Sequence, residues 1–391
     1  MADTIVVTGS LAQKPGQAGH TWQFLQYLLG FRRLGWDVLF LDQLEPSMCV
    51  DRAGQPCPVD RSENVRYFRC VMERYGLGDS YALMVDGGSR FLGLSREAVL
   101  DRVRGSALLL NVMGFLTDEA ILATARRRVF LDTDPGFGQM WQDLGLHDPF
   151  RGHDDFVTIG HNIGRPDCAI PTCGLAWITT PQPVVLEEWP TVAPAIGCSE
   201  RAAFTSVASW RGAYGPIEYR GETYGLRVHE FRKFAPLPRL TARRCELALS
   251  IDPSEERDLA LLNENGWALV DPGVVAADPW IYRAYVQGSH AEFMVAKNMY
   301  VRANSGWFSE RSICYLASGK PVLAQDTGLA GLYPSGEGLL TFSTLEEAAA
   351  GAAELARDYD RHARAARRIA EEHFDSDVVL GRLLRHLRVA R

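Results

Sequence analysis

The feature that most constrains the fold is a strand–helix–strand pattern at the start of the chain. Residues 4–10 (TIVVTGS) form a short apolar run that ends in a Gly-Ser turn, as a buried strand does. An amphipathic segment follows at 21–35, with Arg32 and Arg33 near its end, where cations favour a helix C-terminus. A second apolar run at 36–42 completes the unit. Two strands joined by a crossover helix lie parallel, so this region predicts a parallel α/β sheet.

The same alternation returns in the rest of the chain. In the first half we expect strands at 106–115, 128–134, 153–160 and 176–184, and a helix at 117–127. In the second half we expect strands at 245–252, 267–272, 291–296, 321–326 and 338–342, and helices at 254–266, 279–289, 309–318 and 343–356. A proline-containing segment at 181–198 separates the halves. The pattern predicts two Rossmann-like parallel-sheet domains that face a central cleft.

The length supports two domains, because 391 residues exceed what one ordinary hydrophobic core organises. We place the N-terminal domain at 1–190 and the C-terminal domain at 191–365. A terminal helix at 366–391 is expected to pack back on the first domain. Ser343, with Glu346 three residues later, has the spacing of a capping box and predicts the start of the helix at 343–356.

Composition excludes several classes of protein. The hydrophobic fraction of 47% and the charged fraction of 23% are those of an ordinary globular protein. A net charge of -7 argues against a nucleic-acid-binding surface. The longest apolar run, ALLLNVMGFL, is about half of a membrane span, and no secretory leader is visible. The eight cysteines include no CxxC pair, so we expect a reduced, cytoplasmic protein without a disulfide framework.

The most informative local stretch is NSGWFSERSICYLASGKPV, which predicts a helix from Ser309 to about Gly319. A helix N-terminus has free N–H groups and a partial positive charge, and both suit a phosphate. Gly306 would let a ligand approach the backbone, Arg311 would reach a diphosphate, and Glu310 would accept hydrogen bonds from a ribose. The alternative is an ordinary crossover helix that Ser309 caps and whose dipole Glu310 favours.

This stretch resembles the donor-nucleotide motif of GT-B glycosyltransferases, in which a Gly-containing segment and a helix precede A-x-G-x-P-V. The segment GQAGHTWQFLQYLLGFRRLGWDVLFLD is similar to the start of those enzymes. The resemblance implies a metal-independent GT-B glycosyltransferase without a cofactor. It would move a sugar from a nucleoside diphosphate to a hydroxyl of a small molecule, such as a natural product or a nucleoside-like compound.

The chain departs from the family pattern at two places. Cys314 stands where those enzymes have a helix glutamate, five residues before Gly319, and Glu310 lies one turn earlier. Asn304 and Ser305 precede Gly306 where some members have a histidine.

The resemblance and these positions together define an expected donor site. Its residues are Lys297, Ser305, Gly306, Trp307, Ser309, Glu310, Arg311, Asp326, Thr327 and Gly328. Asp326 and Thr327 stand where the family holds the hydroxyls of the donor sugar. The alternative for this pair is that it caps the turn after the strand.

The resemblance also implies that His20 is a general base, which a neutral imidazole with a pKa near the working pH can be. Asp118 is the first candidate for the acid that orients it, and Asp134 is the second. The alternative is that His20 caps the following helix. Trp22 and Trp141 would form an aromatic floor for the acceptor together with other rings, unless these rings belong to the core. The other rings are Phe24, Tyr27 and Trp177.

Other chemistries compete with this interpretation. Asp132 and Asp134 in DTDP have the spacing with which GT-A transferases hold a divalent metal, although such carboxylates more often cap a strand end. The segment GSLAQKPGQAGH matches neither the P-loop nor GxGxxG. Two further functions fit the same scaffold. One is a nucleotide-sugar 2-epimerase, and the other is a non-catalytic protein that binds nucleotide sugars.

Overall fold

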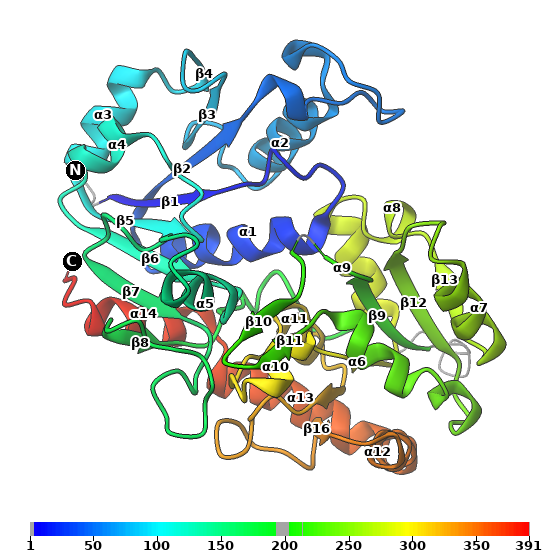
Figure 1. The fold of residues 1–391 in the computed structure, drawn as a ribbon. Coiled ribbons are helices and arrows are strands. Elements are labelled where there is room, and N and C mark those ends of the chain that lie inside the picture. The colour runs from blue at the N-terminus through cyan, green and yellow to red at the C-terminus, as the bar shows by residue number, and fades with distance from the viewer. Residues whose placement is uncertain (1–3, 193–202, 213, 391) are drawn as a thin grey trace.

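The computed structural model describes residues 4–192, 203–212 and 214–390, which form two α/β halves, each built on its own sheet (Figure 1). The first sheet has eight strands in the order β4-β3-β2-β1-β5-β6-β7-β8. All neighbours are parallel except β3 and β4, which form an antiparallel edge. Its strands are β1 (Thr4–Gly9), β2 (Asp37–Leu44), β3 (Tyr81–Val85), β4 (Arg90–Gly93), β5 (Ser106–Val112), β6 (Arg128–Asp132), β7 (Asp155–Thr158) and β8 (Trp177–Thr179).

Five helices accompany this sheet: α1 (Ala18–Arg33), α2 (Glu63–Arg74), α3 (Arg96–Arg104), α4 (Glu119–Thr124) and α5 (Phe137–Asp143). Two short 3-10 turns lie at Pro46–Met48 and Val59–Arg61. Helix α1 begins at Ala18, three residues before the predicted start. Its N-terminal end contacts the second half, because the Ala18 N–H donates to the Ala276 carbonyl at 3.1 Å.

The second sheet has six parallel strands in the order β13-β12-β9-β14-β15-β16. They are β9 (Phe204–Ser209), β12 (Cys245–Ser250), β13 (Ala268–Val270), β14 (Ala291–Met294), β15 (Val322–Gln325) and β16 (Leu339–Phe342). A separate hairpin joins β10 (Ile217–Tyr219) to β11 (Glu222–Tyr224). The predicted strands are present, but β9 was not predicted, although it lies near the middle of this sheet. The strands β3 and β4 of the first sheet were not predicted either.

The helices of this half are α6 (Arg227–Phe234), α7 (Glu256–Glu264), α8 (Pro272–Val275), α9 (Pro279–Gly288), α10 (Asn298–Arg302), α11 (Glu310–Ala317) and α12 (Leu345–Arg357), with a 3-10 turn at Leu237–Arg239. Helix α11 has Ser309 as its N-cap and is followed by Gly319 at φ +70°. The predicted capping box of α12 is displaced by one residue. Thr344 accepts from the Glu347 N–H, and the Glu347 carboxylate accepts from the Thr344 N–H.

Two C-terminal helices complete the chain: α13 (Tyr359–His373) and α14 (Ser376–His386). Helix α13 packs on α11, and α14 returns to pack on α1. At that contact Gly30 is necessary, because a Cβ there would lie 2.5 Å from the Leu380 side chain. Arg33 pairs with Asp377 at 3.0 Å across the same contact. The C-terminal segment therefore packs on the first half, as expected.

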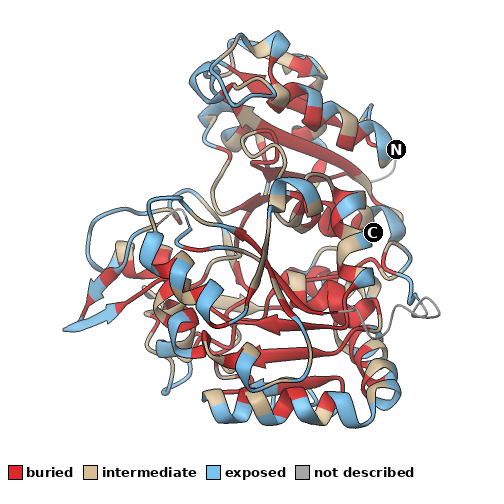
Figure 2. Ribbon diagram, turned by 90° about the vertical axis from the view of Figure 1, so that its right-hand side faces the viewer, coloured by how far each residue is buried: buried red, intermediate tan, exposed pale blue. Residues whose placement is uncertain are grey.

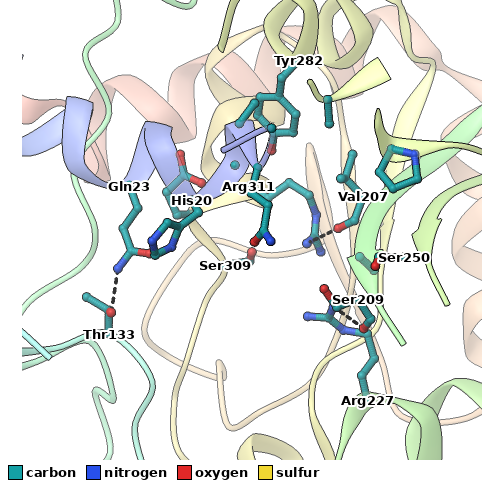
Figure 3. Close-up of a pocket in the computed structure, with 18 of the residues that line it drawn as sticks. His20, Gln23, Thr133, Val207, Ser209, Arg227, Ser250, Tyr282, Ser309 and Arg311 are labelled. Atoms are coloured by element: carbon teal, nitrogen blue, oxygen red, sulfur yellow. Dashed lines mark hydrogen bonds between the residues drawn. The ribbon is translucent and has the colours of Figure 1, made fainter. Parts of the chain in front are cut away.

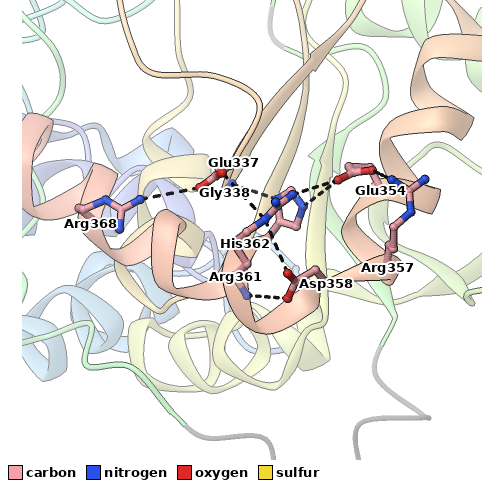
Figure 4. Close-up of polar contacts among 8 residues, drawn as sticks. All are labelled: Glu337, Gly338, Glu354, Arg357, Asp358, Arg361, His362 and Arg368. Carbon is pink, nitrogen blue, oxygen red and sulfur yellow. Dashed lines mark hydrogen bonds and ion pairs between the residues drawn. The ribbon is translucent and has the colours of Figure 1, made fainter.

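A buried histidine fixes the start of α13 (Figure 4). The His362 ring is fully buried, and its Nδ1 accepts from the Gly338 N–H at 3.2 Å. Glu354 lies 3.8 Å from Nε2, and Arg361 pairs with the same carboxylate at 3.1 Å. This contact ties the end of the chain to the strand β16.

The buried apolar residues that the structure describes form three clusters, and the largest of them includes residues of both halves. Buried residues gather on the strands and on the helix faces that cover them (Figure 2). The predicted boundary at 190/191 falls between β8 and β9. Part of the predicted linker at 181–198 lies outside the described residues. Within the described residues the seven cysteines are free, and no helix is long and apolar enough to cross a membrane.

Candidate functional site

A cavity of about 360 Å³ lies where the carboxyl ends of both sheets face each other (Figure 3). The first half contributes the segment 16–20 after β1 and Thr133 after β6. The second half contributes the end of β9, at 207–209, and the start of α11, at 309–311. Strand order reverses at β1 and β5 in the first sheet and at β9 and β14 in the second. Open α/β sheets bind their ligands at such reversals, so the cavity is in the expected place for a substrate.

The start of α11 presents polar groups to this cavity. The Ser309 side chain makes no cap hydrogen bond, which leaves its hydroxyl available beside the free N–H groups of the helix. Arg311 also lines the cavity. Its Nε donates to buried Glu292, its Nη1 donates to the Val207 carbonyl at 2.7 Å, and its Nη2 has no partner within the described structure. This end of the cavity is therefore suited to an anion.

Arg227 adds a second cation that the sequence analysis missed. Its guanidinium donates to the carbonyls of Val295 at 3.0 Å and Ser209 at 3.3 Å, and no carboxylate pairs with it among the described residues. Burial and the neighbouring Arg311 lower the pKa of Arg227 to about 10, so it stays charged at neutral pH. No local pattern marks this arginine, because only the fold brings the first residue of α6 to the cleft.

Glu310 lines the cavity, although its side chain is largely buried. Burial raises the pKa of its carboxyl to about 7, and the Cys314 thiol donates to it at 3.0 Å. Cys314, which replaces the glutamate of the family pattern, therefore contacts the acidic residue that lies one turn earlier. The Tyr282 hydroxyl also lines the cavity and has no partner within the described structure.

His20 lies in the first turn of α1 and lines the cavity. Its Nε2 is 3.0 Å from the Ser10 hydroxyl and 3.3 Å from the Ser10 carbonyl, and its ring packs edge-on against Phe24. Burial and the charge of Lys14 lower the pKa of His20 to about 3, so the imidazole is neutral.

Asp118 does not orient His20, which corrects the sequence interpretation. Its carboxylate caps α4 by accepting from the Ile121 N–H at 2.9 Å and pairs with Arg96 at 3.0 Å. It does not line the cavity. Asp118 caps the N-terminus of a short helix, and the His20 ring is held in place by Ser10.

Besides Lys297, five of the expected donor residues do not line the cavity: Ser305, Gly306, Asp326, Thr327 and Gly328. Gly306 and Gly328 have φ values of +68° and +93°, and a Cβ on either would collide with Asn162. The Asn162 side chain donates to the carbonyls of Asn304 at 3.0 Å and Gly328 at 2.9 Å. These glycines therefore allow the two halves to pack closely, which corrects the expectation that Gly306 admits a ligand.

The three polar members of this group have internal partners. Ser305 accepts from the Trp307 N–H, and Thr327 donates to the Trp307 carbonyl. The Asp326 carboxylate accepts from Gly328 and Leu329 at 2.9 Å, which is the turn-capping alternative. Trp307 itself lines the cavity.

Lys297 lies beside a smaller adjoining cavity of about 270 Å³. Its ammonium pairs with Asp134 at 2.6 Å, and Tyr300 donates to the same carboxylate. Asp132 is buried and accepts from Gln139 and from Thr158, both at 2.7 Å. The two acids of DTDP are thus occupied by different partners, and no group of three metal-ligating side chains exists among the residues described.

The two tryptophans proposed for the acceptor line neither of these two cavities. Trp22 is fully buried, its indole N–H donates to the Pro279 carbonyl at 2.9 Å, and its ring packs on Trp189. It belongs to the core, which corrects the sequence interpretation. Trp141 is half-buried, and its ring contacts Tyr214, which lines the smaller cavity.

The fold is that of GT-B glycosyltransferase structures. Anabaena HepE in complex with UDP and glucose superposes with a TM-score of 0.60 at 13% identity over all of both chains. An alpha-glucosyltransferase in complex with UDP gives 0.59 at 11% identity, over 99% of this chain and 100% of that chain. Sucrose-phosphate synthase from Thermosynechococcus elongatus gives 0.52 at 12% identity over all of both chains. No protein-family model matches the chain, and a search of curated proteins finds no match.

Proposed function

We propose that the protein transfers a sugar from a nucleoside diphosphate to a hydroxyl of a small molecule. The observation that carries this proposal is the anion-binding end of the cavity, where Ser309, Arg311 and Arg227 converge from two elements of the second half. UDP is the first nucleotide to test, because the similar structures of HepE and of the alpha-glucosyltransferase hold it. The protein would be a metal-independent enzyme, since the two arginines and the helix dipole supply positive charge for the departing diphosphate.

His20 is the proposed general base. In the tautomer whose Nε2–H donates to the Ser10 carbonyl, Nδ1 carries the lone pair that accepts a proton. The acceptor oxygen bonds to the anomeric carbon, and the bond from that carbon to the diphosphate oxygen breaks. The electron pair leaves with the diphosphate, and the hydroxyl proton passes to His20.

The donor would contact Trp307, Ser309 and Arg311 of the expected set, together with Arg227. Glu310, from the cavity wall, would accept a hydrogen bond from the ribose when it is ionised. Lys297 would not contact the donor, because it lines the smaller adjoining cavity instead.

Melting temperatures measured with UDP-, dTDP-, GDP- and ADP-sugars test the proposal. A bound donor raises the melting temperature by mass action, so at least one nucleotide sugar should stabilise the protein. If none changes the melting temperature, the proposal is wrong. Conversion of the donor sugar without an acceptor would support the 2-epimerase instead.

A further inference from the structure

The smaller cavity is continuous with the donor cavity and is strongly basic. The two share five lining residues, namely His20, Gln23, Thr133, Ser209 and Arg227. If the larger cavity holds the donor, these shared residues mark where the anomeric carbon and the acceptor hydroxyl would meet. The smaller cavity is then the acceptor side.

Four cations line the smaller cavity: Lys14, Arg211, Arg227 and Lys297. Asp134 is the single carboxylate among its described lining residues, and Lys297 already pairs with it at 2.6 Å. Arg211 pairs with Glu255 outside this cavity. The remaining positive charge has no protein partner there, and an anionic ligand would neutralise it.

Lys14 is the least satisfied of these cations. Its side chain is half-buried, and its ammonium has no hydrogen bond or ion pair with any residue that the structure describes. The backbone around it is held firmly, because the Lys14 N–H donates to Leu11 at 3.2 Å and the Ala12 N–H donates to buried Asp42 at 2.8 Å. A charge kept partly out of water on a fixed loop is ready for a ligand.

We propose that the acceptor carries a carboxylate or a phosphate monoester, which binds to Lys14 beside Lys297. This inference rests on the proposed function and names the substrate class of the same site. The diphosphate of the donor does not account for these lysines, because neither of them lines the larger cavity. Only four lysines occur among 41 basic residues, and two of the four lie here.

The proposal also bears on the basicity of His20. Burial, the larger cause, and the charge of Lys14 lower the pKa of His20. An anion bound to Lys14 would cancel the second of these causes and raise this pKa. A base with a pKa near the working pH takes the proton of the hydroxyl more effectively. An anionic acceptor would therefore activate the group that deprotonates it.

Binding of small anions to the UDP-saturated protein tests the proposal. The probes are inorganic phosphate, 4-hydroxybenzoate and its neutral methyl ester, each measured by calorimetry. The wild type should bind one or both anions and prefer 4-hydroxybenzoate to the ester. Lys14→Met should weaken anion binding roughly tenfold or more, because it removes a charge-assisted contact. Arg69→Met, which removes an exposed cation that lines neither cavity, should have no such effect.

The outcomes distinguish the proposal of an anionic acceptor from the proposed sugar transfer. If the wild type binds phosphate more tightly than 4-hydroxybenzoate, the acceptor carries a phosphate monoester. If it binds 4-hydroxybenzoate more tightly, the acceptor carries a carboxylate. The inference is overturned if neither anion binds, if Lys14→Met binds both as the wild type does, or if the anions compete with UDP. Failure of UDP to bind would contradict the proposed function, and the anions are then measured on the free protein. The melting temperature of Lys14→Met shows that it is folded.

Discussion

Removing the charge of Arg227 is the sharpest perturbation of the proposed donor site. The guanidinium holds only two carbonyls, so Arg227→Met leaves no carboxylate without a partner. The loss of these hydrogen bonds should cost about 1–2 kcal/mol of folding free energy, which the fold tolerates. A charge-assisted hydrogen bond to phosphate contributes about 2 kcal/mol, so the Kd for UDP should rise roughly 30-fold.

Arg311→Met is expected to behave differently, although it removes the same charge from the same cavity. It would leave Glu292 buried without a counter-ion, which costs roughly 3–5 kcal/mol of folding free energy. Its effect on UDP binding would therefore be mixed with unfolding. Arg227→Met is the better probe because its loss of affinity comes with a small change in melting temperature.

Calorimetric titration of UDP at low and at high salt measures the effect. Arg69→Met on α2 is the matched control, since it removes an exposed arginine that lines neither cavity. The control should bind UDP as the wild type does. If Arg227→Met also binds UDP with unchanged affinity, the diphosphate does not contact this cation and the reasoning fails.

Three further predictions follow from the buried titratable groups. His20→Ala should slow sugar transfer by about 10²–10⁴-fold while the Kd for UDP stays constant; equal loss of both would assign His20 to binding. Burial raises the pKa of Glu310 from 4.5 to about 7, so the folded state disfavours its ionised form and loses stability as the pH rises from 4.5 to 7. Glu310→Gln should accordingly melt at a higher temperature than the wild type at pH 8, and the difference should vanish near pH 4.5; a constant difference would refute this origin. Burial lowers the pKa of His362, whose Nδ1 accepts from Gly338, so this contact stabilises the fold above pH 6.5 and is lost as the pH falls. Replacing His362 by Ala should cost about 1–3 kcal/mol in chemical denaturation at pH 8 and less in acid; an unchanged free energy at pH 8 would contradict the role of the contact.

Apolar runs were sufficient to predict most strands, because parallel strands are buried on both faces. They failed for β9, Phe204–Ser209, whose sequence FTSVAS is short and half polar. Its place near the middle of the second sheet depends on pairing with β12 and β14, which are distant in the sequence. Local composition does not report such pairing.

The start of α11 was predictable, because Ser309 and Gly319 have the residue types that helix ends require. The contacts of the neighbouring glycines were not predictable. Gly306 and Gly328 have positive φ, and a glycine at such a position is compatible either with a bound ligand or with close packing of another segment. The residue that packs against these glycines decides between the two possibilities. It is Asn162, which lies far away in the sequence.

The cations of the cleft were missed for a related reason. Arginine makes up all but four of the 41 basic residues, so an arginine gives little information by itself, and no local pattern marked Lys14. Arg227 and Lys14 are distinguished by the lack of a carboxylate partner within the cleft, which is a property of the folded chain. Trp22 is the opposite case. It lies close to His20 in the sequence and was predicted to contact the acceptor, but its side chain points into the core.

A crystal structure of the protein with UDP tests the central claim most directly. We predict that the diphosphate lies at the N-terminus of α11, in contact with Ser309 and with the guanidinium of Arg227, and that His20 faces the vacant sugar position. A diphosphate bound anywhere else would contradict the account.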